Sequence, residues 1–236
     1  MKDLTTFNVT PFDSKAAVIE HIHQHCHIEK PYHIITANPE IIYEAVNNPV
    51  FANIFHQADL VIADGIGVAL PLSWAGYQSE RVPGIDVFEA LLRDSKLGEK
   101  GVYLLGAKLT TVTKTAENLT EQGTHVCGYR DGFFSLDDKT ISALTTEIKA
   151  LNPSIIAIAM GAPRQDEVIA LLKASGINGI FIGVGGAFDV LSGELKRAPS
   201  VWQKIKLEWL FRLLSDLRRL PRYKKIFSYF IWLFKG

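Results

Sequence analysis

Short runs of apolar, mostly β-branched residues alternate along the chain with longer stretches whose apolar positions recur at helical spacing. The short runs predict buried strands at residues 33–37, 60–63, 101–105, 155–160 and 179–184. The longer stretches predict helices at residues 39–47, 50–57, 85–95, 109–122 and 164–175. This order and spacing is typical of an α/β, Rossmann-like fold, in which a mostly parallel sheet carries helices on both faces.

The length and composition fit one main α/β body. A chain of 236 residues with 47% hydrophobic and 21% charged residues can bury a full core. The first residues lack a basic flank followed by an apolar segment, so no secretory or lipidation signal is indicated and we expect a cytoplasmic protein. Cys26 and Cys127 are far apart and lack CxxC spacing, which predicts ordinary thiols.

Charge is distributed unevenly, although the whole chain is formally neutral. Residues 196–236 hold eleven Lys and Arg against two acidic residues, an excess of nine positive charges, and residues 1–195 carry the opposite excess. A basic end of this kind usually meets an anionic surface, either nucleic acid or acidic lipid. We therefore expect an α/β domain at 1–195 and a basic, aromatic appendage at 196–236.

The appendage has the pattern of amphipathic helices. Apolar residues from Trp202 to Leu220 recur at helical spacing, and an apolar aromatic run follows at 226–234. That run is far shorter than the roughly 20 residues that a membrane-spanning helix needs. Because aromatic residues flanked by Lys and Arg favour the membrane interface, we favour contact with a bilayer surface over a terminal helix packed on the core.

The ends of the predicted strands carry a candidate site. Asp64 follows the run 60–63 and precedes Gly65, so it could take a proton from an acceptor hydroxyl, although an Asp at such a position is more often a turn or helix-capping residue. Other polar residues lie at strand ends or in nearby loops, where open α/β sheets bind ligands. They are Thr36, Asn38, Arg81 and Gln165, which could converge on a sugar diphosphate.

Two loops could hold phosphate. Arg81 lies in a turn-rich segment before a predicted helix, where a guanidinium could bind phosphate in bidentate fashion or could be a solvated loop residue. The glycine-rich segment 183–186 allows close backbone approach to a ligand, although glycines after a strand are as often packing or turn residues. This segment is neither a GxGxxG fingerprint nor a Walker loop, which weakens the case for a nicotinamide-dependent oxidoreductase.

The sequence indicates neither a metal nor a cofactor. It has no Asp-x-Asp after a strand and no His, Asp and Glu cluster with ligand spacing. The alternating His21, His23, His25 and His27 could suggest zinc, but a solvated helix face is favoured because no acidic partner supports a metal site. A diphosphate leaving group would then depend on Arg, Lys, backbone N–H groups or helix N-termini.

Five segments together resemble the TagA/WecG/CpsF glycosyltransferases, which build lipid-linked cell-surface polymers in bacteria. They are Thr36-Ala37-Asn38-Pro39-Glu40, Ala63-Asp64-Gly65-Ile66-Gly67, Arg81-Val82-Pro83-Gly84-Ile85-Asp86, Met160-Gly161-Ala162-Pro163-Arg164-Gln165-Asp166-Glu167, and Gly183-Val184-Gly185-Gly186-Ala187-Phe188-Asp189 with Lys196-Arg197-Ala198-Pro199. The resemblance continues into the tail at 207–214 and covers nearly the whole chain.

The resemblance implies an inverting transfer, without metal or cofactor, of N-acetylmannosamine (ManNAc) from UDP to the 4-hydroxyl of N-acetylglucosamine (GlcNAc) on undecaprenyl diphosphate. Such a step belongs to teichoic-acid linkage or surface-polysaccharide synthesis, and the Thr-x-Asn-Pro-Glu form is closer to the teichoic-acid linkage enzymes. The resemblance implies Asp64 as the base, Thr36, Asn38 and Gln165 on the sugars, Arg81 on the diphosphate or sugar, and tail arginines Arg212, Arg219 and Arg222 closing over the site. It also implies a peripheral protein on the inner face of the cell membrane, which exchanges between a homo-oligomer and a membrane-bound monomer.

Three alternatives stay open from the sequence. The donor could carry ManNAc uronic acid in place of ManNAc. A basic-tailed nucleic-acid-binding protein would use its Lys and Arg on phosphates, but the apolar aromatic run 226–234 argues against a nucleic-acid partner. A nucleotide-dependent oxidoreductase is permitted by the fold alone.

Overall fold

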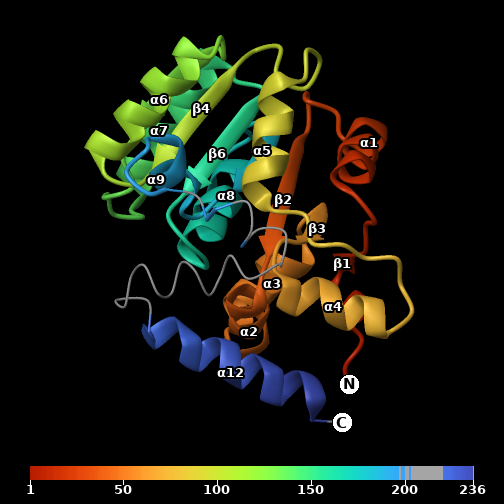
Figure 1. Cartoon of the computed structure of the whole chain (residues 1–236). Helices are drawn as coiled ribbons and strands as arrows, with labels where there is room; N and C mark the ends of the chain where they lie inside the picture. The colour runs from red at the N-terminus through yellow and green to blue at the C-terminus, as the bar shows by residue number, and fades with distance from the viewer. Residues whose placement is uncertain (197, 200–201, 203–219, 236) are drawn as a thin grey trace.

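In the part of the chain that the structure describes, seven parallel strands form one sheet in the order β1-β3-β2-β7-β6-β4-β5 (Figure 1). The computed structural model describes residues 1–196, 198–199, 202 and 220–235. Within these ranges the strands are β1 (Val9–Thr10), β2 (Pro31–Ala37), β3 (Leu60–Ala63), β4 (Val102–Gly106), β5 (Val126–Arg130), β6 (Ile155–Ala159) and β7 (Gly179–Gly183). Strands β4, β6 and β7 are buried along their whole length, as expected where helices cover both faces of a parallel sheet.

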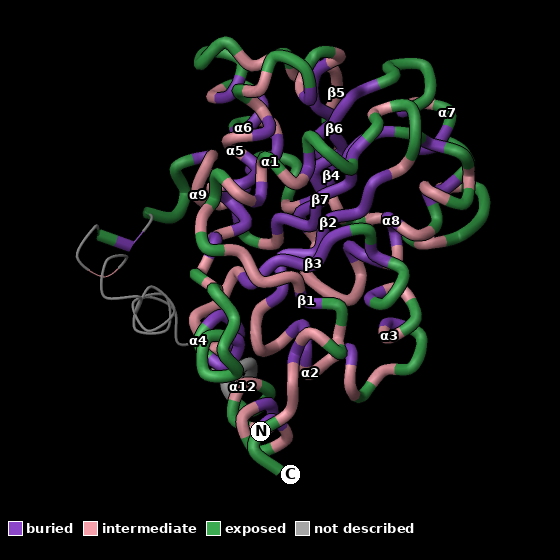
Figure 2. Tube along the Cα trace, turned by 90° about the vertical axis from the view of Figure 1, so that its right-hand side faces the viewer, coloured by how far each residue is buried: buried purple, intermediate pink, exposed green. Residues whose placement is uncertain are grey.

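Helices cover both faces of the sheet. One face carries α1 (Lys15–His25), α5 (Gly84–Arg93), α6 (Leu109–Glu121) and α9 (Ala187–Leu191). The other carries α2 (Pro39–Asn47), α3 (Pro49–His56), α4 (Ile66–Trp74), α7 (Asp138–Leu151), α8 (Arg164–Ala174) and α12 (Leu220–Phe234). Side chains alternate along β2, so Ile34 enters the core beneath α1 and α5 while Ile35 enters the core beneath α2 and α3. Figure 2 shows the buried residues concentrated along the strands.

The predicted α/β fold is confirmed. All five predicted strands and all five predicted helices are present, with ends that differ from the prediction by at most two residues. The pattern misses the edge strands β1 and β5, the helix α4, which contains Pro71, and the helices α7 and α9. The domain boundary at residue 195 stays a prediction, because most of residues 196–219 lie outside the described part of the chain.

Helix α12 packs against α2 and the beginning of α4, on the outer side of α2 in Figure 1. Its Tyr229 and Leu233 are fully buried in the same apolar core as Phe51. An ion pair adds to this contact, since the Lys225 ammonium lies 2.7 Å from the Glu44 carboxylate on α2. Packing on the core, the alternative that the sequence disfavoured, is therefore observed for one side of α12.

The opposite side of α12 is open to solvent. Phe227, Ile231 and Phe234, at positions i, i+4 and i+7, are 69%, 45% and 53% exposed. No helix in the described ranges is both long and apolar enough to cross a membrane. Contact of this exposed side with a bilayer surface stays a prediction.

Candidate active site

The carboxyl ends of β2, β3 and β7 lie side by side and carry most of the predicted site residues. The chain passes from β2 to β3 on one side, whereas β7, which comes much later in the sequence, pairs with β2 on the other. Open α/β sheets bind ligands at such a change in strand order, beyond the carboxyl ends of the strands. Thr36 and Asn38 lie at the end of β2, Asp64 directly follows β3, and Gly185 lies just after β7.

Asp64 and Arg81 lie next to each other beyond β3. Arg81 Nε donates to the Asp64 backbone carbonyl at 2.7 Å, and a terminal guanidinium nitrogen lies 3.8 Å from the Asp64 carboxylate. The Asp64 side chain is 29% exposed and that of Arg81 16%. Gly65 is the N-cap of α4, so Asp64 is not a helix-capping residue, which was one alternative to its role as a base. The pair is an accessible carboxylate beside a cation that is held in place, and Arg81 is not a solvated loop residue.

Thr36 is buried and connects three parts of the site. Its hydroxyl donates to the Gly183 carbonyl at 3.0 Å, which links β2 to β7. A methyl group on Gly84 would lie only 2.7 Å from Thr36 Cγ2, so the first residue of α5 packs directly on Thr36. This contact brings the segment that begins at Arg81 against β2.

Part of the Asn38 side chain is used to cap a helix, which leaves only its amide nitrogen for the predicted sugar contact. It is the N-cap of α2, and its side-chain oxygen accepts a hydrogen bond from the Ile41 N–H at 3.0 Å. The amide nitrogen makes no hydrogen bond to the described residues. Only this amide group is therefore available to donate to a ligand.

Gln165 joins the start of α8 to the loop after β7. The side chain is 3% exposed, and its oxygen accepts from the Gly185 N–H at 3.3 Å. A methyl group on Gly183 would lie within 2.9 Å of Gln165 Cδ, so the absence of a side chain at Gly183 makes room for the amide. The structure thus brings Thr36, Gln165 and the glycine-rich loop together.

The side chains of the three predicted tail arginines lie outside the described part of the chain. Arg212 and Arg219 lie outside the described residues. Arg222 belongs to α12, but its side chain is also outside the described part. Closure of these arginines over the site stays a prediction.

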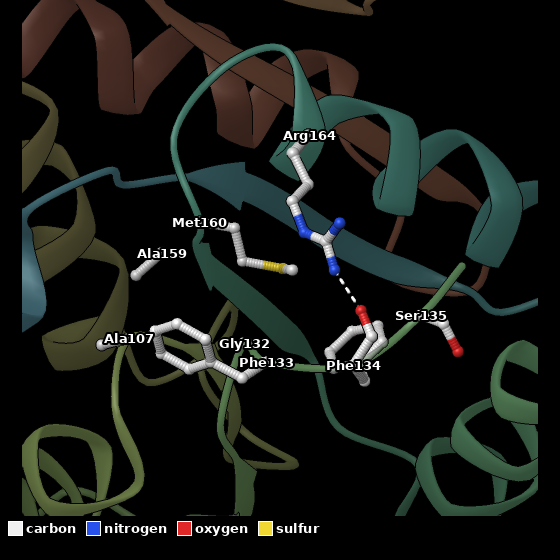
Figure 3. A pocket seen from close by; sticks show the side chains of 8 residues that line it. All are labelled: Ala107, Gly132, Phe133, Phe134, Ser135, Ala159, Met160 and Arg164. Carbon is white, nitrogen blue, oxygen red and sulfur yellow. Dashed lines mark hydrogen bonds between the residues drawn. The ribbon is translucent and has the colours of Figure 1, made fainter.

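A cavity of about 640 Å³ opens at the carboxyl ends of β4, β5 and β6, on the side of β7 opposite to β2 (Figure 3). Its lining residues are Ala107, Gly132, Phe133, Phe134, Ser135, Ala159, Met160 and Arg164. The sequence pattern did not predict this cavity, although Met160 and Arg164 lie in the segment 160–167 that carries part of the family resemblance. The adjacent aromatic residues Phe133 and Phe134 were the available signal, but they follow β5, whose weak apolar pattern left the preceding strand unpredicted.

Aromatic rings and guanidinium groups lie together at this cavity. Arg164 donates to the Phe134 backbone carbonyl, and its guanidinium carbon lies 5.7 Å from the centre of the Phe134 ring (Figure 3). The Arg130 guanidinium lies at the same distance from that ring. Phe133 is 76% exposed, an unusual position for a large apolar side chain. Such a surface can hold a planar ring beside an anionic group.

Two helices begin at the edge of the cavity. Helix α6 starts two residues after Ala107, and α8 starts at Arg164. Neither helix has a side chain that caps its first N–H groups. Uncapped helix N-termini beside Lys108 and Arg164 can donate to phosphate oxygens.

Of the histidines considered for zinc, His21, His23 and His25 lie on α1, and His27 follows its end. His23 Nε2 is 2.7 Å from Asp94, and His25 Nδ1 is 2.9 Å from the His21 carbonyl. Across the described ranges, no three His, Cys, Asp or Glu side chains are placed together to hold a metal ion.

A parallel α/β sheet with a carboxylate and a guanidinium near its change in strand order, and a cavity edged by helix N-termini, forms a candidate enzyme site with groups that can bind a phosphorylated substrate. The chain matches the model of the glycosyl transferase WecG/TagA/CpsF family over residues 3–235. Because the match covers nearly the whole chain, the protein belongs to this family of glycosyltransferases, and a sugar-nucleotide donor and an acceptor are its expected partners.

Proposed function

We propose that the protein is an inverting, metal-independent transferase that moves ManNAc from UDP-ManNAc to the 4-hydroxyl of GlcNAc on undecaprenyl diphosphate. The product would enter teichoic-acid linkage or surface-polysaccharide synthesis. Family membership supports glycosyl transfer. The observation that carries the mechanism is the accessible Asp64 carboxylate, held beside Arg81 at the change in strand order.

In this proposal Asp64 is the general base. The acceptor hydroxyl oxygen attacks the anomeric carbon from the side opposite UDP, and its proton passes to the Asp64 carboxylate. The bond between the anomeric carbon and the β-phosphate oxygen breaks, and UDP leaves with the electron pair. One displacement inverts the anomeric configuration. A positioned base typically contributes about 10²–10⁴-fold to the rate.

The leaving diphosphate requires positive charge from the protein itself. Arg81 lies beside Asp64, and Arg164 lines the cavity at the start of α8. Both groups, together with the uncapped N–H groups of α6 and α8, can stabilise the charge that develops on the departing UDP.

We place the nucleoside of the donor in the cavity of Figure 3, with its base against the exposed ring of Phe133. Strands β3 and β6 are three positions apart in the sheet, which corresponds to roughly 14 Å at the usual strand spacing. A diphosphate that crosses the ends of β7 and β2 would bring the sugar to Asp64. Asn38 could then donate to a sugar hydroxyl. The buried Thr36 and Gln165 would hold the loop after β7 in place beside the sugar.

The lipid-linked acceptor requires access from a membrane surface. The exposed side of α12, formed by Phe227, Ile231 and Phe234, with the exposed Lys224 seven residues before Ile231, fits a shallow contact with anionic lipid. A peripheral position on the inner face of the membrane is therefore part of the proposal.

The deciding experiment measures sugar transfer from UDP-ManNAc to a short-chain GlcNAc-diphosphoryl-lipid in EDTA. Asp64→Asn should lower kcat at least about 100-fold because the base is lost. Asp138→Asn, an exposed carboxylate in the first turn of α7, serves as the matched control and should transfer at the wild-type rate. Equal rates for wild type and Asp64→Asn would remove Asp64 from the mechanism.

The same assay separates the two candidate donors. Product from UDP-ManNAc supports the proposal, whereas product only from its uronic acid would transfer the proposal to the alternative donor. Loss of wild-type activity in EDTA, with recovery on adding Mg²⁺, would overturn metal independence.

A further inference from the structure

Helix α12 makes a polar contact with the loop that carries Asp64. The hydroxyl of Tyr229 donates to the backbone carbonyl of Gly67 at 2.9 Å, and Tyr229 is fully buried. Gly67 lies in the first turn of α4, three residues after Asp64. Burial raises the pKa of the Tyr229 hydroxyl, so this group stays a protonated donor at neutral pH.

The Gly67 carbonyl has no normal partner within its own helix. In an α-helix the carbonyl of residue i accepts from the N–H of residue i+4, which here is Pro71, a residue without an N–H. An unpaired buried carbonyl is costly, so such groups almost always find another donor. Tyr229 supplies that donor from a helix 162 residues further along the chain.

Close packing fixes the same turn from two more sides. A methyl group on Gly67 would lie 2.7 Å from Pro39 Cγ and 3.2 Å from the Phe230 ring. One on Gly65 would lie 3.1 Å from Pro39 Cδ. The turn after Asp64 is thus held between the first residue of α2 and the inner side of α12.

We propose that Tyr229 is a positioning residue for glycosyl transfer, whose hydroxyl replaces the helical hydrogen bond that Pro71 removes and so holds the Asp64 loop against Arg81. The inference rests on the proposed function, since it takes Asp64 as the base. It gives α12 a catalytic consequence that does not depend on the tail arginines. Displacement of α12 withdraws the donor and releases the first turn of α4.

The first test removes only the hydroxyl. Tyr229→Phe keeps the buried ring and should lower kcat about five- to tenfold, the size expected for loss of one neutral hydrogen bond. The KM for UDP-ManNAc and the affinity for UDP should be unchanged, because the cavity lies at the ends of β4, β5 and β6, whereas Tyr229 contacts the turn after β3. Tyr32→Phe is the matched control, because the Tyr32 hydroxyl is buried without a partner among the described residues, and it should behave like wild type.

The second test restores the missing donor by another route. Pro71→Ala returns an N–H at residue 71, so the double variant Pro71→Ala with Tyr229→Phe should recover at least half of the kcat of Pro71→Ala alone. If Tyr229 served only to fill space, Pro71→Ala would not restore kcat, because Tyr229→Phe and the double variant both keep the aromatic ring. Thermal unfolding of each variant confirms that the compared proteins are folded at the assay temperature.

Two results would overturn the inference. Wild-type kcat in Tyr229→Phe, with Asp64→Asn still inactive, would refute the positioning role and leave the proposed function intact. A double variant as slow as Tyr229→Phe would show that the hydroxyl does not act through the Gly67 carbonyl. Full activity of Asp64→Asn would instead refute the base assignment, whatever the behaviour of Tyr229→Phe.

Discussion

At the scale of single residues, two glycines allow buried polar side chains to shape the site. The segment 183–186 predicts close backbone approach to a ligand, but at Gly183 the close neighbour is the side chain of Gln165. Gly84 plays the same part for Thr36. Sequence position alone predicts Asp64 and Arg81 at a strand end. It cannot predict which protein groups occupy the space beside a glycine, because that depends on contacts between distant elements.

Gly183→Ala should therefore impair the protein by displacing Gln165. The added methyl group would lie within 2.9 Å of Gln165 Cδ, and forced repacking of this kind costs about 1–3 kcal/mol. Unfolding in urea and the transfer assay measure the two effects. If both variants act through one contact, combining Gly183→Ala with Gln165→Ala should be clearly less damaging than the sum of the single changes. Full additivity would contradict this explanation.

At the scale of elements, the apolar pattern predicts the five inner strands of the sheet and the helices α2, α3, α5, α6 and α8, and it misses the edge strands β1 and β5 and the helices α4, α7 and α9. Strand β5 at the edge is partly exposed, and α4 is apolar almost throughout and interrupted by Pro71, so neither has a clear period. The cavity beside β6 depends on the loop after β5, which is why its residues were not predicted. Helix α12 was expected as an amphipathic helix, but the sequence pattern does not show that it packs on α2 and α4.

The ion pair that joins α12 to α2 should be lost in acid. The hydrogen bond from Lys225 lowers the pKa of Glu44, so its stabilisation is present above the usual Glu pKa of about 4.3 and is lost as pH falls through the lower folded-state value. Glu44→Gln should lower the free energy of unfolding by about 0.2–1 kcal/mol at pH 7 and by clearly less at pH 3. Glu117→Gln, an exposed glutamate on α6, is the control and should change little at either pH. A pH-independent loss in Glu44→Gln would contradict the assignment.

At the scale of the whole molecule, apolar side chains gather on one outer surface. The exposed residues of α12 are joined there by Trp74 at the end of α4, whose ring lies 6.3 Å from that of Phe234. The sequence predicted the aromatic, basic character of this segment. Which of its residues stay exposed depends on the burial of Tyr229 and Leu233 in the core, a tertiary contact that the sequence pattern does not specify.

This surface should bind anionic vesicles. Replacing Phe227 and Ile231 together by Ser should weaken binding to phosphatidylglycerol-containing vesicles about tenfold or more, because both side chains would otherwise enter the interface. Phe133→Ser removes an equally exposed aromatic residue from the cavity and should leave co-sedimentation with vesicles unchanged. Undiminished binding by the Phe227 and Ile231 double variant would exclude this side of α12 as the contact.

The contact between Tyr229 and Gly67 also has a consequence during synthesis of the chain. A ribosome that adds about 5–20 residues per second makes residue 229 roughly 8–30 s after residue 67. Throughout that interval the apolar sides of α2 and α4, which α12 covers in the finished protein, are open to water. The nascent chain therefore presents an aggregation-prone surface early and can order its Asp64 loop only late, so we expect it to depend on chaperones until α12 emerges.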